Sequence, residues 1–251
     1  MNKLTQEKAR PIIFSGPMIS AILQGTKTQT RRIVQGVSNQ RAASYYIQDN
    51  RWWSEDWEKS GCRNTIDCPY GEPGELLWCR ETGGVHTRSA GGSKTPRPGG
   101  WLGLGYKADG LGEGSILDVD MEHTYWVKPP DPLYKGGTDL WIHYREKTRW
   151  QKWLSPLHMP RWASRLHLFI EEIRIERLQD ITEADAIAES IQPYHRKCTS
   201  NEPGCTVSAK ARYARLWDQI NGERASWASN PWVWKLTFHA KDCPLEIGEM
   251  K

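Results

Sequence analysis

The segment 25–32, with the sequence GTKTQTRR, constrains the fold of this chain more strongly than any other stretch. It directly follows an apolar helical run and carries one amine, two guanidinium groups and three hydroxyl groups. A Lys or Arg head group that is buried without a partner costs several kcal/mol. We therefore expect this segment at the surface or in a cleft.

An extended strand over this segment divides its side chains between two faces. Side chains two residues apart point the same way, which separates Thr28, Thr30 and Arg32 from Lys27, Gln29 and Arg31. A turn at Gly25 could also fold Lys27 back towards Thr30, the arrangement that a Lys-activated Thr nucleophile needs. The simpler alternative is a basic strand at a sheet edge, where Lys and Arg discourage aggregation between strands.

The composition is that of a polar but globular protein. The 251 residues suit one large domain, or one domain with insertions, and are enough to bury a core. The hydrophobic content of 38% and the aromatic content of 10% exclude a chain that is disordered throughout. The 14 Trp, against 3 Phe, suit cores, interfaces and base-stacking platforms alike. A net charge of +4 and a pI ≈ 8.7 permit an anionic partner, although a dedicated nucleic-acid binder usually has a pI above about 9.

The sequence offers no membrane segment. No apolar run approaches the ~18 residues of a membrane span, and the N-terminal MNKLTQEKARP lacks the apolar core of a signal peptide. We expect a cytoplasmic protein with no membrane partner, whose six cysteines are thiols rather than disulfides. His195, Cys198 and Cys205 could supply three zinc ligands, but their spacing is loose. Free thiols are the favoured interpretation, and we expect no metal and no cofactor.

The N-terminal part predicts a strand, a helix and a second strand. Residues 11–15 form the first strand, and Ser15 caps a helix that Pro17 enters in its first turn. Gly25 ends this helix, and the polar strand follows as far as Val34. The apolar side of the helix is formed by Met18, Ala21, Ile22 and Leu23.

Further strands and helices follow in the middle and C-terminal parts. A turn at 71–74 leads into a strand at 75–81, and 165–178 form a long strand with a bend or bulge near Glu171. Thr182 caps a helix over TEADAIAES, with Glu183 and Asp185 in its first turn. A second helix over 208–220 packs through Ala211, Ala214, Leu216 and Trp217, and 231–238 form the last strand.

We interpret the chain as a single α+β domain, 1–251, built around a curved sheet or small barrel. Segments 35–67 and 83–156 are predicted insertions, and 191–207 a loop insertion. Within the second insertion we expect short strands near 102–107 and 139–144, with a mobile loop at 91–100. Neither a repeat nor a Rossmann or phosphate-loop glycine pattern is present in the sequence.

Five blocks of the sequence together resemble ASCH-domain proteins, most closely the phage and prophage branch with large insertions. The blocks are AILQGTKTQTRR, GEPGELLWCRE, HMPRWASRLHLFI, ERLQDITEADAIAE and LWDQINGERASWASNPWVWKLTF. They cover about half of the chain between Pro11 and Phe238. The resemblance implies a PUA-like β-barrel with flanking helices and a cleft for RNA or modified nucleosides.

The resemblance also implies an activity. Some small bacterial members are amidohydrolases that remove the acetyl group from N4-acetylcytidine, and others are reported as ribonucleases. In the amidohydrolases a Lys and a Thr lie in a motif G-x-K-x-x-T, which Lys27 and Thr30 match, and a Glu lies on a later helix, which Glu189 matches. Glu183 and Asp185 are the alternatives for the carboxylate.

Amide hydrolysis needs a nucleophile, a base for its proton and an acid for the departing amine. Thr30 would attack the acyl carbon or position a water molecule, and a neutral Lys27 would be the base. Glu189 would carry the proton to the cytosine amine, and Arg31, Arg32 or backbone N–H groups would stabilise the oxyanion. In the simpler alternatives Lys27 contacts phosphate, Thr30 pairs across a sheet, and Glu189 forms an ion pair on a helix surface.

The remaining candidates are contacts to substrate or nucleic acid, namely Thr28, Arg31, Arg32, Arg80, Arg161 and Trp162. Arg161 and Trp162 could clamp a phosphate and a base, although a Pro-Arg-Trp turn more often packs its aromatic ring inward. The chain is more than twice the size of a minimal ASCH unit, so two non-enzymatic functions stay open. It could bind RNA or modified bases without catalysis, or be a phage accessory or assembly protein whose Trp-rich insertions bind a phage or host protein.

Overall fold

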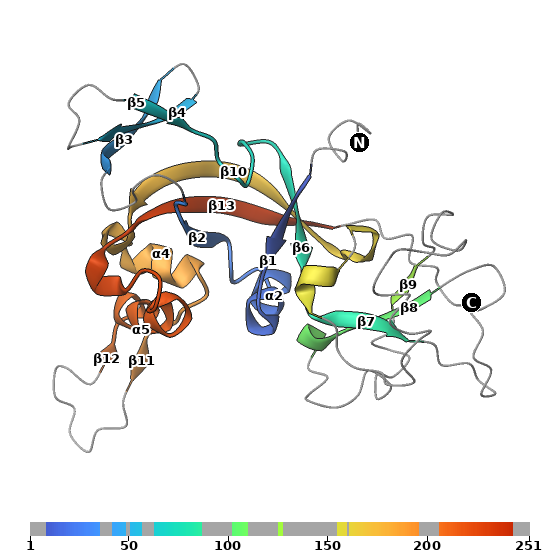
Figure 1. The fold of residues 1–251 in the computed structure, drawn as a ribbon. Coiled ribbons are helices and arrows are strands. Elements are labelled where there is room, and N and C mark those ends of the chain that lie inside the picture. Colours follow the sequence, from blue (N-terminus) through green and yellow to red (C-terminus); the bar gives the residue numbers. More distant parts are fainter. Residues whose placement is uncertain are drawn as a thin grey trace, which may run out of the picture. The chain divides into compact units, whose positions relative to one another are not determined.

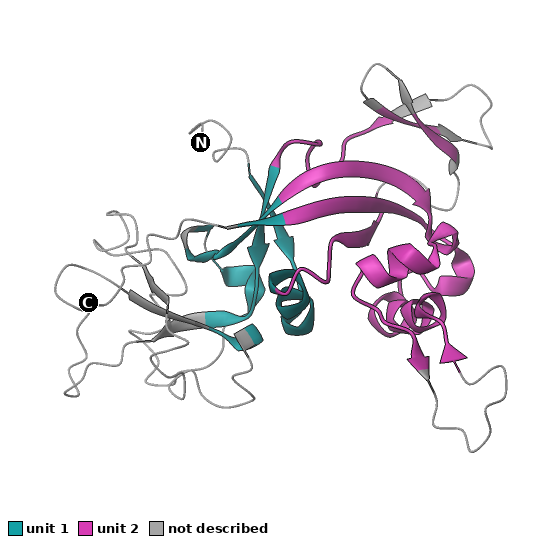
Figure 2. Cartoon of the chain, turned by 180° about the vertical axis from the view of Figure 1, so that it is seen from behind, with its two compact units in different colours: residues 1–23, 76–168, 240–251 teal, residues 24–75, 169–239 magenta. Residues whose placement is uncertain are grey.

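The structure is a computed structural model that describes residues 9–35, 42–48, 51–56, 63–86, 102–109, 125–127, 155–159, 161–195 and 206–242. It has an α+β fold with a curled, mixed five-stranded sheet, strand order β1-β6-β10-β13-β2, and few helices (Figure 1). The chain divides into two compact units (Figure 2). Unit 1 comprises residues 1–23, 76–168 and 240–251, and unit 2 comprises residues 24–75 and 169–239.

Unit 1 begins with a parallel strand pair. Strand β1 (Arg10–Ile13) lies beside β6 (Leu76–Arg80), and the helix α2 (Gly16–Leu23) follows β1. The Ser20 hydroxyl donates to the Ala108 carbonyl at 2.8 Å, which holds α2 against the 3-10 turn η1 (Lys107–Asp109). A separate antiparallel sheet is formed by β7 (Gly83–His86), β8 (Leu102–Tyr106) and β9 (Tyr125–Val127).

The predicted strand-helix-strand start of the chain is confirmed, with one change in the buried face of the helix. Gly25 has φ +72°, a left-handed conformation that glycine adopts without strain and that ends the helix. Ile19, not Leu23, contributes to the core, since Leu23 is 50% exposed. The other buried residues of α2 are Ala21 and Ile22, as predicted.

Unit 2 contains the antiparallel pair of β2 (Gln29–Ile33) and β13 (Trp232–Asp242), whose last residues belong to unit 1. The long strand β10 (Leu166–Arg177) confirms the prediction for this segment. Along β10, buried residues alternate up to Ile170, and the next buried residue is Ile173. This change of phase lies at the predicted bend, and β10 and β13 are both strongly curved (Figure 1).

Two helices pack together in unit 2. Helix α4 (Glu183–Ala188) starts with a capping box between Thr182 and Asp185, so the predicted cap is confirmed. Helix α5 (Ala209–Asn221) is capped by Ser208, but Ala211 is exposed, contrary to the predicted packing face. The buried residues of α5 are Ala209, Tyr213 and Trp217, and they form one core with Leu178, Ile181, Ala186 and Val233.

The predicted insertion at 35–67 contains a three-stranded antiparallel sheet, with β3 (Ala42–Gln48), β4 (Arg51–Asp56) and β5 (Arg63–Ile66). It packs on β13 through edge-to-face ring pairs, Tyr45 with Trp232 and Trp52 with Trp234. The predicted loop 191–207 includes a short hairpin, β11 (Tyr194–His195) with β12 (Thr206–Val207).

Several predictions concern the Gly-rich segment after β6. The strand near 102–107 is confirmed as β8, whereas β7 and β9 are strands that the sequence analysis missed. The predicted loop 91–100 and the predicted strand 139–144 lie outside the described residues. Cys68 and Cys79 are free, buried thiols, as predicted. Among the described residues, no helix has the length and apolar character that crossing a membrane requires.

Candidate active site

The candidate site is centred on an ion pair between Lys27 and Glu189, both in unit 2. The Lys27 Nζ lies 2.6 Å from the Glu189 Oε2 and 3.3 Å from the Glu189 carbonyl oxygen. The two side chains are only 1% and 6% exposed. The pair is therefore desolvated, and its attraction is stronger than that of an ion pair in water.

The backbone brings these two residues together. Lys27 and Glu189 form an isolated antiparallel bridge, and the Thr28 N–H donates to the Ala188 carbonyl at 2.8 Å. Helix α4 ends at Ala188, so Glu189 is its C-terminal capping residue. The resemblance implied a position on the helix itself, which is wrong by one residue. The next residue, Ser190, has a left-handed φ of 70°.

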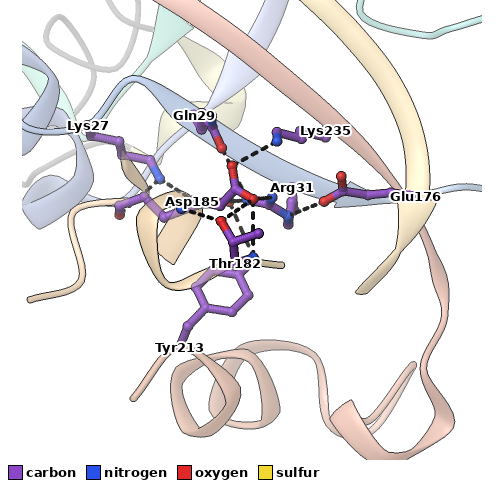
Figure 3. Close-up of polar contacts among 9 residues, drawn as sticks. Lys27, Gln29, Arg31, Glu176, Thr182, Asp185, Tyr213 and Lys235 are labelled. Carbon is purple, nitrogen blue, oxygen red and sulfur yellow. Dashed lines mark hydrogen bonds and ion pairs between the residues drawn. The ribbon is translucent and has the colours of Figure 1, made fainter. Parts of the chain in front are cut away.

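Arg31 connects the pair to two further carboxylates. Its guanidinium group is fully buried and lies 2.8 Å from the Glu176 Oε1, 3.3 Å from the Glu189 Oε1 and 3.4 Å from the Asp185 Oδ2. The contact with Asp185 is an ion pair without an aligned hydrogen bond, since the Arg31 Nη2 has no hydrogen-bond partner among the residues that the structure describes. The six charged residues that these ion pairs join are called the charge cluster: Lys27, Arg31, Lys235, Glu176, Asp185 and Glu189. All of them except Glu189 are labelled in Figure 3.

The charge cluster balances three cations against three carboxylates, and its contacts shift the pKa of Arg31 and of Asp185. Burial lowers the pKa of Arg31, but the carboxylates of Glu189 and Glu176 outweigh burial, so the net pKa is raised. For Asp185 burial raises the pKa, but hydrogen bonds from Lys235 and Thr182 and the charge of Arg31 lower it well below its usual range. Arg31 and Asp185 are therefore held in their charged forms.

Tyr213 closes the cluster from helix α5. Its hydroxyl donates to the Glu189 Oε1 at 3.4 Å, and its side chain is buried. Burial, followed by the charge of Glu189, raises the pKa of Tyr213 well above its usual value. The phenol is therefore a neutral donor at physiological pH, and it fixes one oxygen of Glu189 while Lys27 holds the other.

The structure brings two of the three predicted catalytic residues together and places the third elsewhere. Lys27 and Arg31 belong to the charge cluster, and Gln29 accepts from the Arg31 Nη1, in agreement with the predicted alternation along the strand. Thr30 pairs with Leu236 on β13, whereas Arg31 pairs with Lys235. Because neighbouring residues of a strand face opposite sides, Thr30 points away from the face that carries Arg31.

The other predicted residues are not members of the charge cluster. Thr28 is exposed, and Arg32 is half-buried and paired with Trp234 across the strands, on the same side as Thr30. In unit 1, Arg80 stacks on the Trp78 ring at 4.7 Å, and the half-buried Arg161 belongs to the 3-10 turn η5 (Arg161–Ala163). The side chain of Trp162 lies outside what the structure describes.

The two alternatives for the catalytic carboxylate have other partners. Glu183 accepts hydrogen bonds from the first N–H groups of α5, those of Ala209 and Lys210. Asp185 belongs to the capping box of α4 and forms an ion pair with Lys235 at 2.8 Å. Of the three candidates, only Glu189 contacts Lys27.

Sequence reasoning missed Glu176, Tyr213 and Lys235 as members of this site. Lys235 carried a usable signal, because it is the charged residue among the mostly apolar residues of the predicted strand 231–238. Tyr213 lies four residues from both Ala209 and Trp217, which is the spacing of one helical face. Glu176 carried no signal, since it lies among several charged residues of β10.

No group of three metal-binding side chains gathers among the residues that the structure describes. Cys198, Cys205 and the side chain of His195 fall outside that part, so the possible zinc site stays untested. The chemistry that the described site offers is proton transfer between an amine and a carboxylate.

The comparison with known proteins identifies no relative. No protein-family model matches the sequence, and neither a curated protein nor a solved structure matches it. The resemblance to ASCH-domain proteins therefore stays a prediction.

Proposed function

We propose that this chain is an amidohydrolase of the ASCH type, with a PUA-like barrel fold, that hydrolyses the acyl amide of a modified cytosine in the cytoplasm. The observation that supports this is the contact of 2.6 Å between the Lys27 Nζ and the Glu189 Oε2. The two residues lie 162 positions apart in the sequence. They are also the amine and the carboxylate that the resemblance selects.

The protonation of the pair suggests which group does what. In an ion pair the carboxylate of Glu189 is free to accept a proton, and the ammonium group of Lys27 is able to donate one. We therefore assign Glu189 as the general base and Lys27 as the general acid, which reverses the roles expected from the sequence. A side chain that transfers a proton in this way typically increases the reaction rate by about 100- to 10,000-fold.

The proposed reaction conserves protons. Glu189 takes a proton from the attacking water, whose oxygen bonds to the acyl carbon and forms a tetrahedral oxyanion. Lys27 protonates the cytosine N4 as the C–N bond breaks, which releases cytidine and acetic acid. Acetic acid gives up its proton at neutral pH, and the proton on Glu189 returns to Lys27 across their 2.6 Å contact.

The position of Thr30 favours water as the nucleophile. Thr30 is 4% exposed and pairs with Leu236, on the strand face opposite Arg31. A hydroxyl group on that face would not share an acyl carbon with Glu189. Of the two roles expected for Thr30, direct attack is therefore the less supported.

The test is acetate release from N4-acetylcytidine by the purified chain, followed by mass spectrometry of the cytidine formed. Lys27→Met and Glu189→Gln are each expected to lower turnover by at least about 100-fold. Lys107→Met removes an exposed Lys in unit 1 and serves as the matched control. No acetate release by the unmutated chain at high protein concentration would rule out this function.

The burial of the pair favours a second candidate, a non-catalytic module that binds RNA or modified bases. With Lys27 1% and Arg31 0% exposed, the charge cluster can serve as a purely structural link between β2 and the end of α4. Binding should then weaken steeply as salt is added. A chain that binds RNA at low salt, but hydrolyses no modified nucleoside, would support this candidate over the enzyme.

A further inference from the structure

Two hydroxyl groups lie next to the ion pair along both chain segments. Thr26 precedes Lys27, and Ser190 follows Glu189, so the bridge between the charged residues also brings the hydroxyl residues together. The Thr26 Oγ1 and the Ser190 Oγ are 3.4 Å apart. This distance is well above the usual 2.7–2.8 Å of a hydroxyl–hydroxyl bond, so the contact is weak and easily replaced.

These two hydroxyl residues are more accessible than the charged pair beside them. Thr26 is exposed and Ser190 is half-buried. Taken as whole residues, Lys27 and Glu189 are only 2% and 7% exposed. The Glu189 carbonyl oxygen that accepts from the Lys27 Nζ belongs to the peptide bond that leads into Ser190. Ser190 therefore directly follows the carbonyl group that the Lys27 amine contacts.

The backbone at Ser190 is a second and independent observation. Its φ of 70° is uncommon for a residue other than glycine, and at a helix end like that of α4 glycine is the usual residue. The chain has glycine at comparable left-handed positions, Gly25, Gly71 and Gly74. A serine here costs some stability and adds a hydroxyl group, and residues held in such conformations cluster at functional sites.

We propose that Thr26 and Ser190 position the amide of the substrate, a role that rests on the proposed function. An amide presents one donor, its N–H, beside one acceptor, its carbonyl oxygen. One hydroxyl group can accept from the amide N–H, and the other can donate to the amide carbonyl oxygen. Two hydrogen bonds to the ligand then replace the weak contact between Thr26 and Ser190. The acyl group is then held beside Lys27 and Glu189, and the preferred ligand is an N-acylated base rather than a free one.

The test uses Thr26→Val, which removes a hydroxyl at constant shape, and Ser190→Gly, which removes the other and relieves the backbone. Each variant is expected to lower kcat/KM for N4-acetylcytidine by about 3- to 10-fold, mainly through KM. Ser190→Gly should at the same time unfold at an equal or higher urea concentration than the unmutated chain. If the role of Ser190 is purely structural, Ser190→Gly will lower both activity and stability, or will change neither.

The matched control for the backbone is Asn230→Gly. Asn230 also has a left-handed φ, 45°, but its side-chain oxygen accepts from the Gln179 N–H at 2.8 Å. Glycine at this position removes a hydrogen bond far along the chain from Lys27. Its urea midpoint is expected to fall while KM stays unchanged.

Binding measured without turnover separates this inference from the proposed function. The dissociation constant of N4-acetylcytidine is measured in a Lys27→Met background, or in Glu189→Gln if the first variant folds poorly. If the chain binds but never hydrolyses the nucleoside, and both hydroxyl variants weaken binding, the proposed function fails and the positioning role stands. If the chain hydrolyses it and neither variant changes KM or binding, the positioning role is overturned. Absence of both turnover and binding overturns both.

Discussion

Each unit of the molecule buries an ion pair, and the two pairs differ in the cation and in how the carboxylate is held. In unit 1, Arg165 binds Glu81 through two parallel bonds of 2.9 Å, with side chains 4% and 1% exposed. The guanidinium group also stacks on the Tyr106 ring at 4.2 Å. In unit 2, Lys27 holds Glu189 through a single side-chain contact.

The choice of cation explains the difference. Arginine stays protonated at any physiological pH, and its planar fork matches a carboxylate, so the Arg165–Glu81 pair is suited to permanent attachment. Lysine is a point charge that can lose its proton when it is buried. A buried ion pair is therefore no sign of function by itself, and the type of cation and the way it is held are more informative.

The largest effect is expected when Lys27 is replaced by arginine, the cation of the Arg165–Glu81 pair. Lys27→Arg keeps the positive charge beside Glu189 but replaces the amine by a group that does not release its proton. Turnover of N4-acetylcytidine should fall by at least about 100-fold, which corresponds to roughly 2.7 kcal/mol of transition-state stabilisation. Single-turnover kinetics measure this loss. An arginine variant with full activity would mean that charge alone is needed.

The reciprocal change, Arg165→Lys, should affect stability instead. It keeps the charge beside Glu81 but removes one of the two parallel bonds and the stacking on Tyr106. We expect the free energy of unfolding to fall by about 2–3 kcal/mol, as measured by urea titration of tryptophan fluorescence. The folded variant should retain its KM. A stability equal to that of the unmutated chain would show that the fork contributes nothing.

A smaller effect is expected at Tyr213. Tyr213→Phe removes the hydroxyl that donates to the Glu189 Oε1 at 3.4 Å, but Arg31 still contacts the same oxygen at 3.3 Å. Stability should decrease by about 0.5–1.5 kcal/mol, and turnover by less than 10-fold. Calorimetry and steady-state kinetics measure the two quantities. A loss of activity as large as that of Lys27→Arg would make Tyr213 part of the proton transfer itself.

The smallest expected effect is a shift in acid unfolding. Because hydrogen bonds and charge lower the pKa of Asp185 in the folded chain, its contribution to stability is complete above the unfolded pKa of about 3.9 and is lost as the pH falls below that value. Lys235→Met removes the strongest of these hydrogen bonds, so acid unfolding should begin at a higher pH. Circular dichroism during an acid titration tests this. Coincident unfolding curves would contradict it.

The sequence predicts the periodic elements of the fold well because their buried residues follow the period of the structure. The phase change on β10 between Ile170 and Ile173 and the cap of α4 at Thr182 are examples. The strands β7 and β9 were missed because they are short and β7 starts with two glycines, which leaves little periodic signal. On α5 the apolar positions allowed two faces, and the tertiary contacts selected the one with Tyr213.

The candidate site was predictable only in part. Lys27 and Glu189 were identified by their order within matching blocks, and their side chains do lie in contact. The carboxylates and Lys235 that surround Arg31 depend on the register of β2 against β13 and on the position of α4. No local pattern encodes such a register, so the sequence alone could not show that Arg31 pairs with Lys235 across the strands.

The long separation between Lys27 and Glu189 has a consequence for synthesis in the cell. The amine leaves the ribosome 162 residues before the carboxylate that it binds. At about 5–20 residues per second, roughly 8–30 s pass during which the nascent chain carries a lysine with no partner. Strand β13, the neighbour of β2, is synthesised later still, so the sheet beside the ion pair can be completed only after residues 232–242 have been made.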